Sequence, residues 1–136
     1  MSRLTVIISF FLLVLALAAD SRSVADGVYT KEQAARGLTT YRTLCARCHG
    51  ENLLGGDEAP SLAGGEFVER WSGKTVGSLF ELIRTTMPSD GPGTLSRKQC
   101  ADTVAYMLSA NEFPAGQKEL ESDVAPLNEI RIEPKK

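Results

Sequence analysis

The sequence predicts an all-α domain, and three observations favour this fold class. Apolar residues recur at helical spacing in several segments, capping boxes stand at the start of two of them, and the alternation typical of strands is absent. The 136 residues are 43% hydrophobic and 24% charged, which matches globular usage and excludes collagen, coiled-coil and wholly disordered chains. Fifteen basic residues against 17 acidic ones leave no strong cationic face, so nucleic-acid binding is not expected.

The first 19 residues have the pattern of a secretory signal peptide. Arg3 gives a positive start, residues 4–19 are apolar apart from Thr5 and Ser9, and an A-x-A pattern precedes a polar stretch. This run is shorter than the roughly 20 apolar residues that span a membrane. We therefore expect Sec-type export to the periplasm, cleavage of the leader and no membrane span in the mature chain; an uncleaved anchor is the alternative.

The first expected helix covers residues 31–46. Thr30 and Gln33 form a capping box at its start, and Tyr41 and Cys45 continue its apolar face at helical spacing. This helix leads directly into the most distinctive part of the sequence.

A long loop is expected over residues 49–65, where five Gly and one Pro accompany a loss of apolar period. Loops of this length inside a compact domain are usually functional. A short helical turn near 67–71 then precedes a helix that Thr75 caps. Pro88 ends that helix, because proline pushes the preceding residue out of helical dihedrals.

The last expected helix begins at the capping box Ser96–Gln99 and ends near Asn111. The segment after it mixes charges with widely spaced apolar residues, so it either lies across the domain or is partly disordered. The expected organisation is a signal peptide over 1–19, a lead-in over 20–29, a domain over 30–114 and a C-terminal extension over 115–136.

Cys45, Cys48 and His49 form a C-x-x-C-H motif, the strongest chemical signal in the chain. Thiols three residues apart lie on neighbouring turns of one helix face, so both can reach the two vinyl groups of one haem. The adjacent histidine is then held beneath the iron as proximal ligand. The motif therefore indicates covalent haem attachment.

Three alternatives to haem attachment fit the motif less well. A thioredoxin-like redox pair needs a βαβ context, which the pattern lacks. A zinc site needs about four ligands, and only Cys100 remains because His49 is the sole histidine. A structural disulfide between Cys45 and Cys48 is possible in an exported chain but leaves His49 unexplained.

The chain also resembles the class I c-type cytochromes over about residues 37–116. The residues that carry this resemblance are, in order, Gly37 and Tyr41, the run from Cys45 to Gly50, Pro60 and Leu62, Met87 and Pro88, and Tyr106. The stretches that begin at Met87 and end at Gly116 look most like cytochromes found with quinoprotein alcohol dehydrogenases.

The resemblance implies a cytochrome c-like fold, in which three to four helices pack around one covalently bound haem c with histidine and methionine as axial ligands. It implies a carrier of single electrons rather than an enzyme. The implied redox partners are a periplasmic dehydrogenase, with a quinoprotein as one candidate, and an oxidase or another cytochrome.

Several further roles come from the same resemblance. The carbonyl of Pro60 is expected to accept a hydrogen bond from the proximal histidine, although this proline can instead simply stiffen a loop. Trp71 either donates its indole N–H to a haem propionate or serves as a core tryptophan. Gly37, Tyr41 and Tyr106 are expected where the first and last helices cross.

For three further residues the sequence allows two roles each. Arg42 and Arg47 can pair with haem propionates or dock a partner, but a solvated helix face is the default for such charges. Cys100 stands at an apolar helical position, so we expect a buried, unpaired thiol rather than a disulfide-linked dimer.

Met87 is predicted as the distal ligand by elimination. Met1 leaves with the signal peptide, and Met107 lies on the apolar stripe of the last helix, where its thioether is used in packing. Met87 instead stands between a helix and Pro88, 38 residues beyond His49, on a segment free to approach the opposite haem face. The alternative is a core methionine with lysine or water as the sixth ligand.

The function hypotheses separate by what the iron can bind. Saturation by His49 and Met87 leaves no place for substrate, which favours electron transfer by a free carrier or by a cytochrome subunit of a dehydrogenase complex. A peroxidase or a gas or redox sensor needs an open or labile iron position, and a peroxidase usually needs distal acid–base groups. No second histidine exists to supply them.

Overall fold

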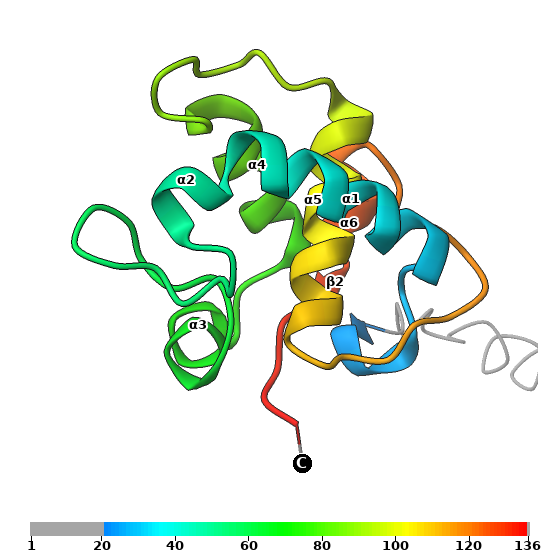
Figure 1. Ribbon diagram of the computed structural model, residues 1–136. Coiled ribbons are helices and arrows are strands. Elements are labelled where there is room, and N and C mark those ends of the chain that lie inside the picture. Colours follow the sequence, from blue (N-terminus) through cyan, green and yellow to red (C-terminus); the bar gives the residue numbers. More distant parts are fainter. Residues whose placement is uncertain (1–20, 136) are drawn as a thin grey trace, which may run out of the picture.

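The described chain, residues 21–135 of this computed structural model, consists of helices and one pair of very short strands (Figure 1). The signal peptide expected over residues 1–19 lies outside the described residues. In chain order the elements are β1 (Arg22–Ser23), the 3-10 helix η2 (Val24–Asp26), α1 (Lys31–Leu44), α2 (Ala46–His49), α3 (Gly65–Trp71), α4 (Val76–Thr86), α5 (Arg97–Ala110), α6 (Val124–Leu127) and β2 (Ile130–Arg131). The predicted all-α class is confirmed.

The helices α1 and α5 cross at the centre of the fold (Figure 1). A Cβ atom at Gly37 would lie 1.8 Å from the backbone oxygen of Asp102, so only glycine permits this close approach. Tyr41 and Tyr106 pack at the same crossing, with ring centroids 5.2 Å apart. The contact predicted between the first and last long helices is therefore present.

Side-chain caps begin the three longest helices. The hydroxyl groups of Thr30, Thr75 and Ser96 each accept a hydrogen bond from the backbone N–H three residues ahead, which satisfies one of the free donors of a helix start. The first helix, however, is not continuous to residue 46 as predicted. At Cys45 the φ angle of −116° departs from helical values, so α1 ends at Leu44 and α2 begins a new short helix.

The strands β1 and β2 pair in parallel, with Arg22 opposite Ile130 and Ser23 opposite Arg131. No strand was expected from the sequence pattern. Two residues are too few to show alternation, so this pairing left no pattern to detect. It ties the start of the described chain to its end.

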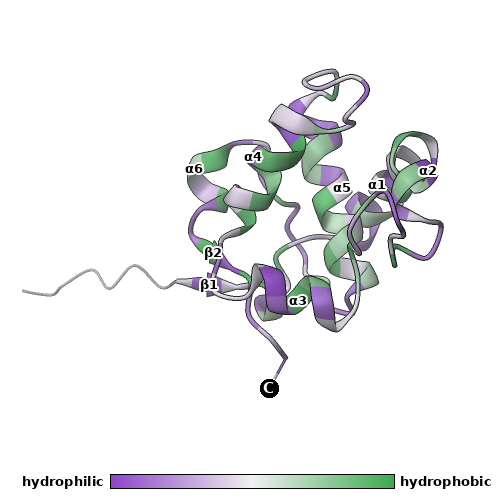
Figure 2. Ribbon diagram, turned by 90° about the vertical axis from the view of Figure 1, so that its left-hand side faces the viewer, coloured by the Kyte–Doolittle hydropathy of each residue, from purple (hydrophilic) through white to green (hydrophobic). Residues whose placement is uncertain are grey.

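The C-terminal extension packs against the domain, which decides between the two alternatives for it. Leu120, Leu127, Ile130 and Ile132 are almost completely buried. The side-chain amide of Gln33 both donates to and accepts from the backbone of Leu120, at 3.1 and 2.8 Å. Figure 2 shows the extension's helix α6 beside α4, on the side away from α2.

The remaining core positions agree with the helical pattern. Cys100 is fully buried within α5, as expected for a thiol that packs as a small apolar group. Among the helices of residues 21–135, none is both long and apolar enough to cross a bilayer.

Candidate functional site

A cavity of about 340 Å³ lies between the C-terminal part of α1, α2, the loop that follows, and the helices α3, α4 and α5. This volume is in the range of cavities that hold small molecules and cofactors. The lining is mostly apolar. Its walls include every residue predicted from the sequence as a site residue, namely Cys45, Cys48, His49, Pro60, Trp71 and Met87.

The orientation of His49 is fixed by the loop that follows it. The side chain is 8% exposed, and its Nδ1 atom lies 2.8 Å from the carbonyl oxygen of Pro60. A carbonyl oxygen can only accept, so Nδ1 carries the hydrogen and donates it. The lone pair of the neutral ring is then on Nε2, which is the form in which histidine binds a metal.

The loop between His49 and Pro60 is held by backbone hydrogen bonds. The Gly55 N–H donates to the carbonyl of His49 at 2.8 Å, and the Tyr41 hydroxyl donates to the carbonyl of Gly50 at 2.6 Å. Gly55 has a φ of +69°, and a Cβ atom there would lie 2.4 Å from a backbone oxygen, so glycine is required. The loop thus returns Pro60 to the imidazole.

The two thiols of the motif are both half-buried and free. Burial, with a smaller contribution from nearby Cys100, raises the pKa of the Cys45 thiol to about 11, so it stays protonated at neutral pH. Within residues 21–135 no three His, Cys, Asp or Glu side chains lie close enough together to hold a metal ion. The donor set for a structural zinc site is therefore missing from this part of the chain.

The methionines Met87 and Met107 both line the cavity. Met87 is half-buried directly after α4, where its N–H donates to the carbonyl of Ile83 at 3.0 Å. Met107 lies on α5 and is almost fully buried, as expected for a packing residue, but its place on the cavity wall was not foreseen.

Four charged residues line the cavity, and sequence reasoning missed them or treated them as ordinary surface: Arg47, Glu58, Arg70 and Asp90. Arg47 forms an ion pair with Asp90, and this pairing lowers the pKa of the Asp90 carboxyl. The Arg70 guanidinium donates to the carbonyl of Ser61 at 3.2 Å, next to Pro60. Arg47 and Asp90 are 43 positions apart and Arg70 and Ser61 are nine apart, so no motif of neighbouring residues indicated either contact.

Trp71 lies on the cavity wall and is mostly buried. Its ring packs 6.4 Å from that of Phe67, and the Lys74 ammonium group lies 5.0 Å from its centroid. The structure therefore places this tryptophan both at the cavity and in the core, and its hydrogen bond to a haem propionate stays a prediction. Arg42 is exposed and does not line the cavity.

A helical domain that places a C-x-x-C-H motif on the wall of an apolar cavity is a class I c-type cytochrome. Residues 32–107 match the family model described as cytochrome c oxidase, cbb3-type, subunit III, and the chain belongs to this family. Comparison with curated proteins gave no match.

The fold is similar to that of a solved structure, the sulfane dehydrogenase SoxCD from Paracoccus pantotrophus. The TM-score is 0.51 at 21% sequence identity, over 79% of this chain and 61% of that chain. At this identity the likeness concerns the fold alone.

The residues present fit the haem c that the family implies. The cavity offers two free thiols at the spacing of the motif, an imidazole with its Nε2 lone pair available, and an apolar wall suited to a porphyrin. The chain thus has the donor set of an electron-transfer cytochrome.

Proposed function

We propose that this chain is a free periplasmic carrier of single electrons, in which Cys45 and Cys48 hold one haem c and His49 and Met87 take its two axial positions. The observation that supports this most strongly is the convergence of these four residues on one cavity, from segments up to 42 positions apart. When bound, haem c supplies a one-electron ferric/ferrous couple.

The chain's own residues prepare the site for that couple. Pro60 orients the His49 ring through the 2.8 Å hydrogen bond and makes its Nε2 atom a better donor. The thioether of Met87 is a soft, neutral donor, and methionine with histidine gives a raised reduction potential. With both positions taken, no place remains for a substrate on the iron, which favours a carrier over an enzyme or sensor.

The periplasmic location rests on the sequence pattern of residues 1–19, which we propose are a cleaved Sec-type signal peptide. A pulse of labelled full-length protein in a bacterial host, followed by fractionation and intact-mass measurement, tests this. We expect a periplasmic product that lacks the leader. A membrane-bound product that keeps it would show an anchor instead.

A free carrier is favoured over a subunit of a dehydrogenase complex. The apolar residues of the C-terminal extension are buried against this same chain and are not available to a neighbouring subunit. For the partners, the family model supports a downstream oxidase, and the solved structure with a similar fold is a sulfane dehydrogenase. We propose a dehydrogenase as electron donor, with a quinoprotein alcohol dehydrogenase as the first candidate.

The test is a redox titration of the exported holoprotein followed by reduction assays. In the titration we expect the haem absorbance to change reversibly with potential, as a single one-electron transition. In the assays we expect rapid reduction by a quinoprotein alcohol dehydrogenase with its substrate present. Reduction by a sulfane dehydrogenase alone would replace the proposed donor. An irreversible or multi-electron response would contradict the carrier function.

A further inference from the structure

The charged side chains of the described residues are paired unevenly. In most parts of residues 21–135, some acidic side chains form ion pairs with a lysine or arginine. Examples are Asp90, Asp102, Glu112 and Glu119. The segment 50–71 contributes to none of these ion pairs. Its five acidic residues are all exposed, and they are Glu51, Asp57, Glu58, Glu66 and Glu69.

The net charge follows the same division. Residues 45–71 hold two basic and five acidic residues, whereas the rest of residues 21–135 holds eleven of each. The negative net charge of the described chain therefore comes entirely from α2, the loop after it and α3. Charges left without internal partners on one side of a protein create the local field that steers an oppositely charged molecule.

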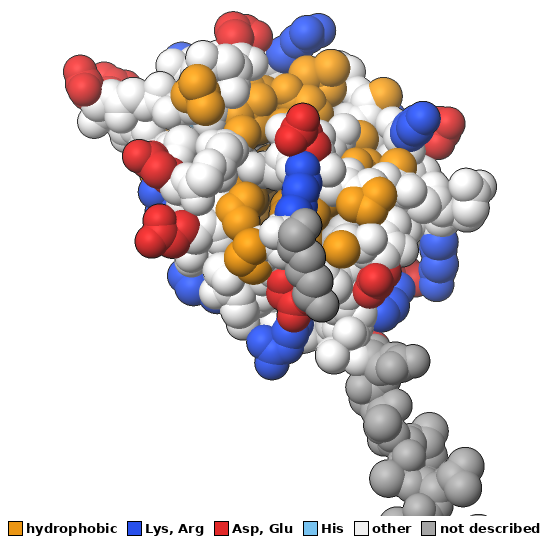
Figure 3. All heavy atoms as spheres, turned by 90° about the horizontal axis from the view of Figure 1, so that it is seen from below, with side chains coloured by type: hydrophobic (Ala, Val, Ile, Leu, Met, Phe, Trp, Pro, Cys, Tyr) orange, Lys and Arg blue, Asp and Glu red, His pale blue; other side chains and the backbone are white. Residues whose placement is uncertain are grey.

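This acidic segment adjoins the candidate haem site. Glu58 lines the cavity itself, and the loop from 50 to 59 is bonded to His49 through Gly55. Figure 1 places the loop and α3 together at the left of the molecule, and Figure 3, seen from below, shows several acidic side chains along that left edge. The acidic loop thus adjoins His49, the proposed proximal ligand.

An exposed leucine lies in the middle of the same loop. Leu53 has a φ of +61° and is buried, while Leu54 is 59% exposed. Leu54 is the most exposed of the large hydrophobic side chains within residues 21–135. An exposed apolar side chain in a loop that also carries three exposed acidic residues without ion pairs has the composition of a protein interface, with an apolar centre and a polar rim.

We propose that residues 50–59 and the exposed side of α3, here called the acidic docking surface, bind a redox partner that presents a basic surface around an apolar recess for Leu54. This inference rests on the proposed function, because it names the kind of partner that exchanges electrons at the site. A metal ion is not the occupant we infer, since no group of three acidic, cysteine or histidine side chains converges within residues 21–135. A macromolecular cation matches the spread of the charges.

The first test measures the local charge with two small oxidants of opposite sign. Reduced holoprotein is mixed with tris(phenanthroline)cobalt(III) or with hexacyanoferrate(III), each of which accepts one electron from the haem. The double variant Glu51→Gln with Asp57→Asn is compared with the matched control Glu129→Gln with Glu133→Gln. Both pairs remove two exposed acidic charges that form no ion pair, and neither pair lines the cavity.

At low ionic strength we expect the loop variant to slow oxidation by the cationic cobalt complex by about threefold and to speed oxidation by the anionic complex. The difference should vanish as salt shortens the screening length to well below about 10 Å. Equal effects of the control pair, or no effect of the loop pair, would overturn the docking proposal. If neither complex oxidises the wild-type holoprotein, the proposed function fails instead.

The second test locates the surface. Amide chemical shifts of labelled, reduced holoprotein are followed while unlabelled mitochondrial cytochrome c, a basic electron carrier, is added. We expect shifts concentrated in residues 50–71, and about threefold weaker binding for Leu54→Ser, with its rates toward the small complexes unchanged. Shifts centred on the extension 115–135, or unchanged affinity of Leu54→Ser, would contradict the assignment.

Discussion

The crossing of α1 and α5 is filled by the chain's own side chains, whereas the cavity beside α2 is not. At the crossing, the polypeptide supplies every group needed: Gly37 lets the backbones meet, and Tyr41 packs on Tyr106. At the cavity, apolar side chains and free thiols surround about 340 Å³ that the chain does not fill itself. An apolar hollow of that size forfeits the contacts that a packed core would make.

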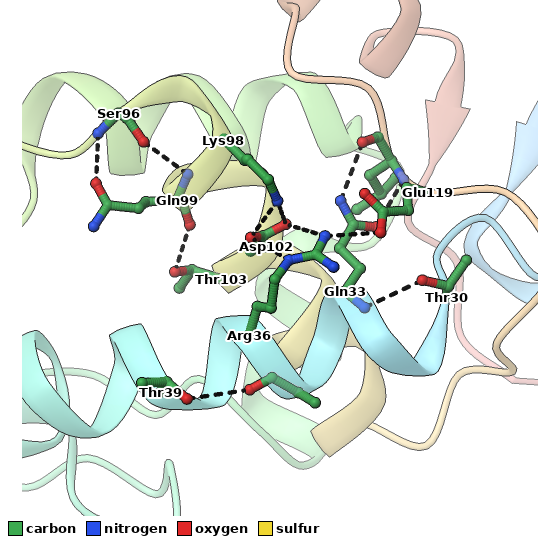
Figure 4. Close-up of polar contacts among 12 residues, drawn as sticks. Thr30, Gln33, Arg36, Thr39, Ser96, Lys98, Gln99, Asp102, Thr103 and Glu119 are labelled. Atoms are coloured by element: carbon green, nitrogen blue, oxygen red, sulfur yellow. Dashed lines mark hydrogen bonds and ion pairs between the residues drawn. The ribbon is translucent and has the colours of Figure 1, made fainter.

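The polar groups at the crossing are likewise paired with other groups of this chain (Figure 4). The Asp102 carboxylate, with a side chain only 7% exposed, accepts hydrogen bonds from Arg36 at 3.0 and 3.1 Å and from Lys98 at 2.9 and 3.3 Å. Burial alone would raise the pKa of this carboxyl, but the two cations outweigh it and the pKa is lowered.

This difference indicates which property a substitution in each region should change. Changes at the crossing should alter the free energy of unfolding and leave the bound cofactor's spectrum unchanged. Changes at the cavity should alter cofactor retention or iron ligation first. The predictions that follow test this division.

Replacing Cys45 or Cys48 with alanine should have the largest effect. One covalent bond to haem is lost, and the cavity wall loses much of the body it packs against, so we expect weak haem retention and poor accumulation. The mass and visible spectrum of the exported protein, with circular dichroism, measure both. A stable apoprotein with native helicity would contradict this prediction.

Gly37→Ala should damage the crossing. The added methyl group would lie 1.8 Å from a backbone oxygen, so the helices must separate, at a cost of about 3 kcal/mol in the free energy of unfolding. Gly65→Ala is the control, because no atom lies within 4 Å of a Cβ there. Denaturant unfolding of the two variants should differ clearly, and equal stability would show that the crossing relaxes easily.

Asp102→Asn should cost about 2 kcal/mol at neutral pH, because charge-assisted hydrogen bonds are lost. The folded pKa lies below the ordinary value of 3.8, so the carboxylate stabilises the fold above that pH and the benefit disappears as pH falls through the lower folded pKa. The difference in the free energy of unfolding between wild type and variant should therefore become smaller below about pH 4. A difference that stays constant down to about pH 3 would contradict the assignment.

Cys100→Ala should have the smallest effect. The thiol is fully buried in α5, so its removal should cost about 1 kcal/mol from lost packing. The haem spectrum and the monomeric state should be unchanged, which makes this variant the control for the two motif cysteines. Loss of a disulfide-linked dimer on mutation, seen by gel filtration without reductant, would show a different role.

The parts of the fold that sequence could predict depend on neighbours in the chain. The caps at Thr30, Thr75 and Ser96 and the crossing at Gly37 were all foreseen, since each follows from local spacing or from the family resemblance. The break at Cys45 was missed because the apolar period continues through it.

Other features depend on groups that are distant in sequence. The β1–β2 pair joins residues more than 100 positions apart, and Arg47 meets Asp90 across 43 positions. Neither carries a motif. The burial of the extension likewise depends on complementary surfaces, such as Gln33 against the Leu120 backbone, that spacing alone does not reveal.

The central claim is that His49 and Met87 together saturate the iron, and carbon monoxide tests it most directly. The reduced wild-type holoprotein should show no rapid change in its visible spectrum under carbon monoxide. Met87→Ala should bind the gas, lose the weak long-wavelength sulfur-to-iron band of the ferric form and have a lower potential, while Met107→Leu should behave as wild type. Rapid binding by the wild type, or a Met87→Ala variant that keeps the band, would contradict the account.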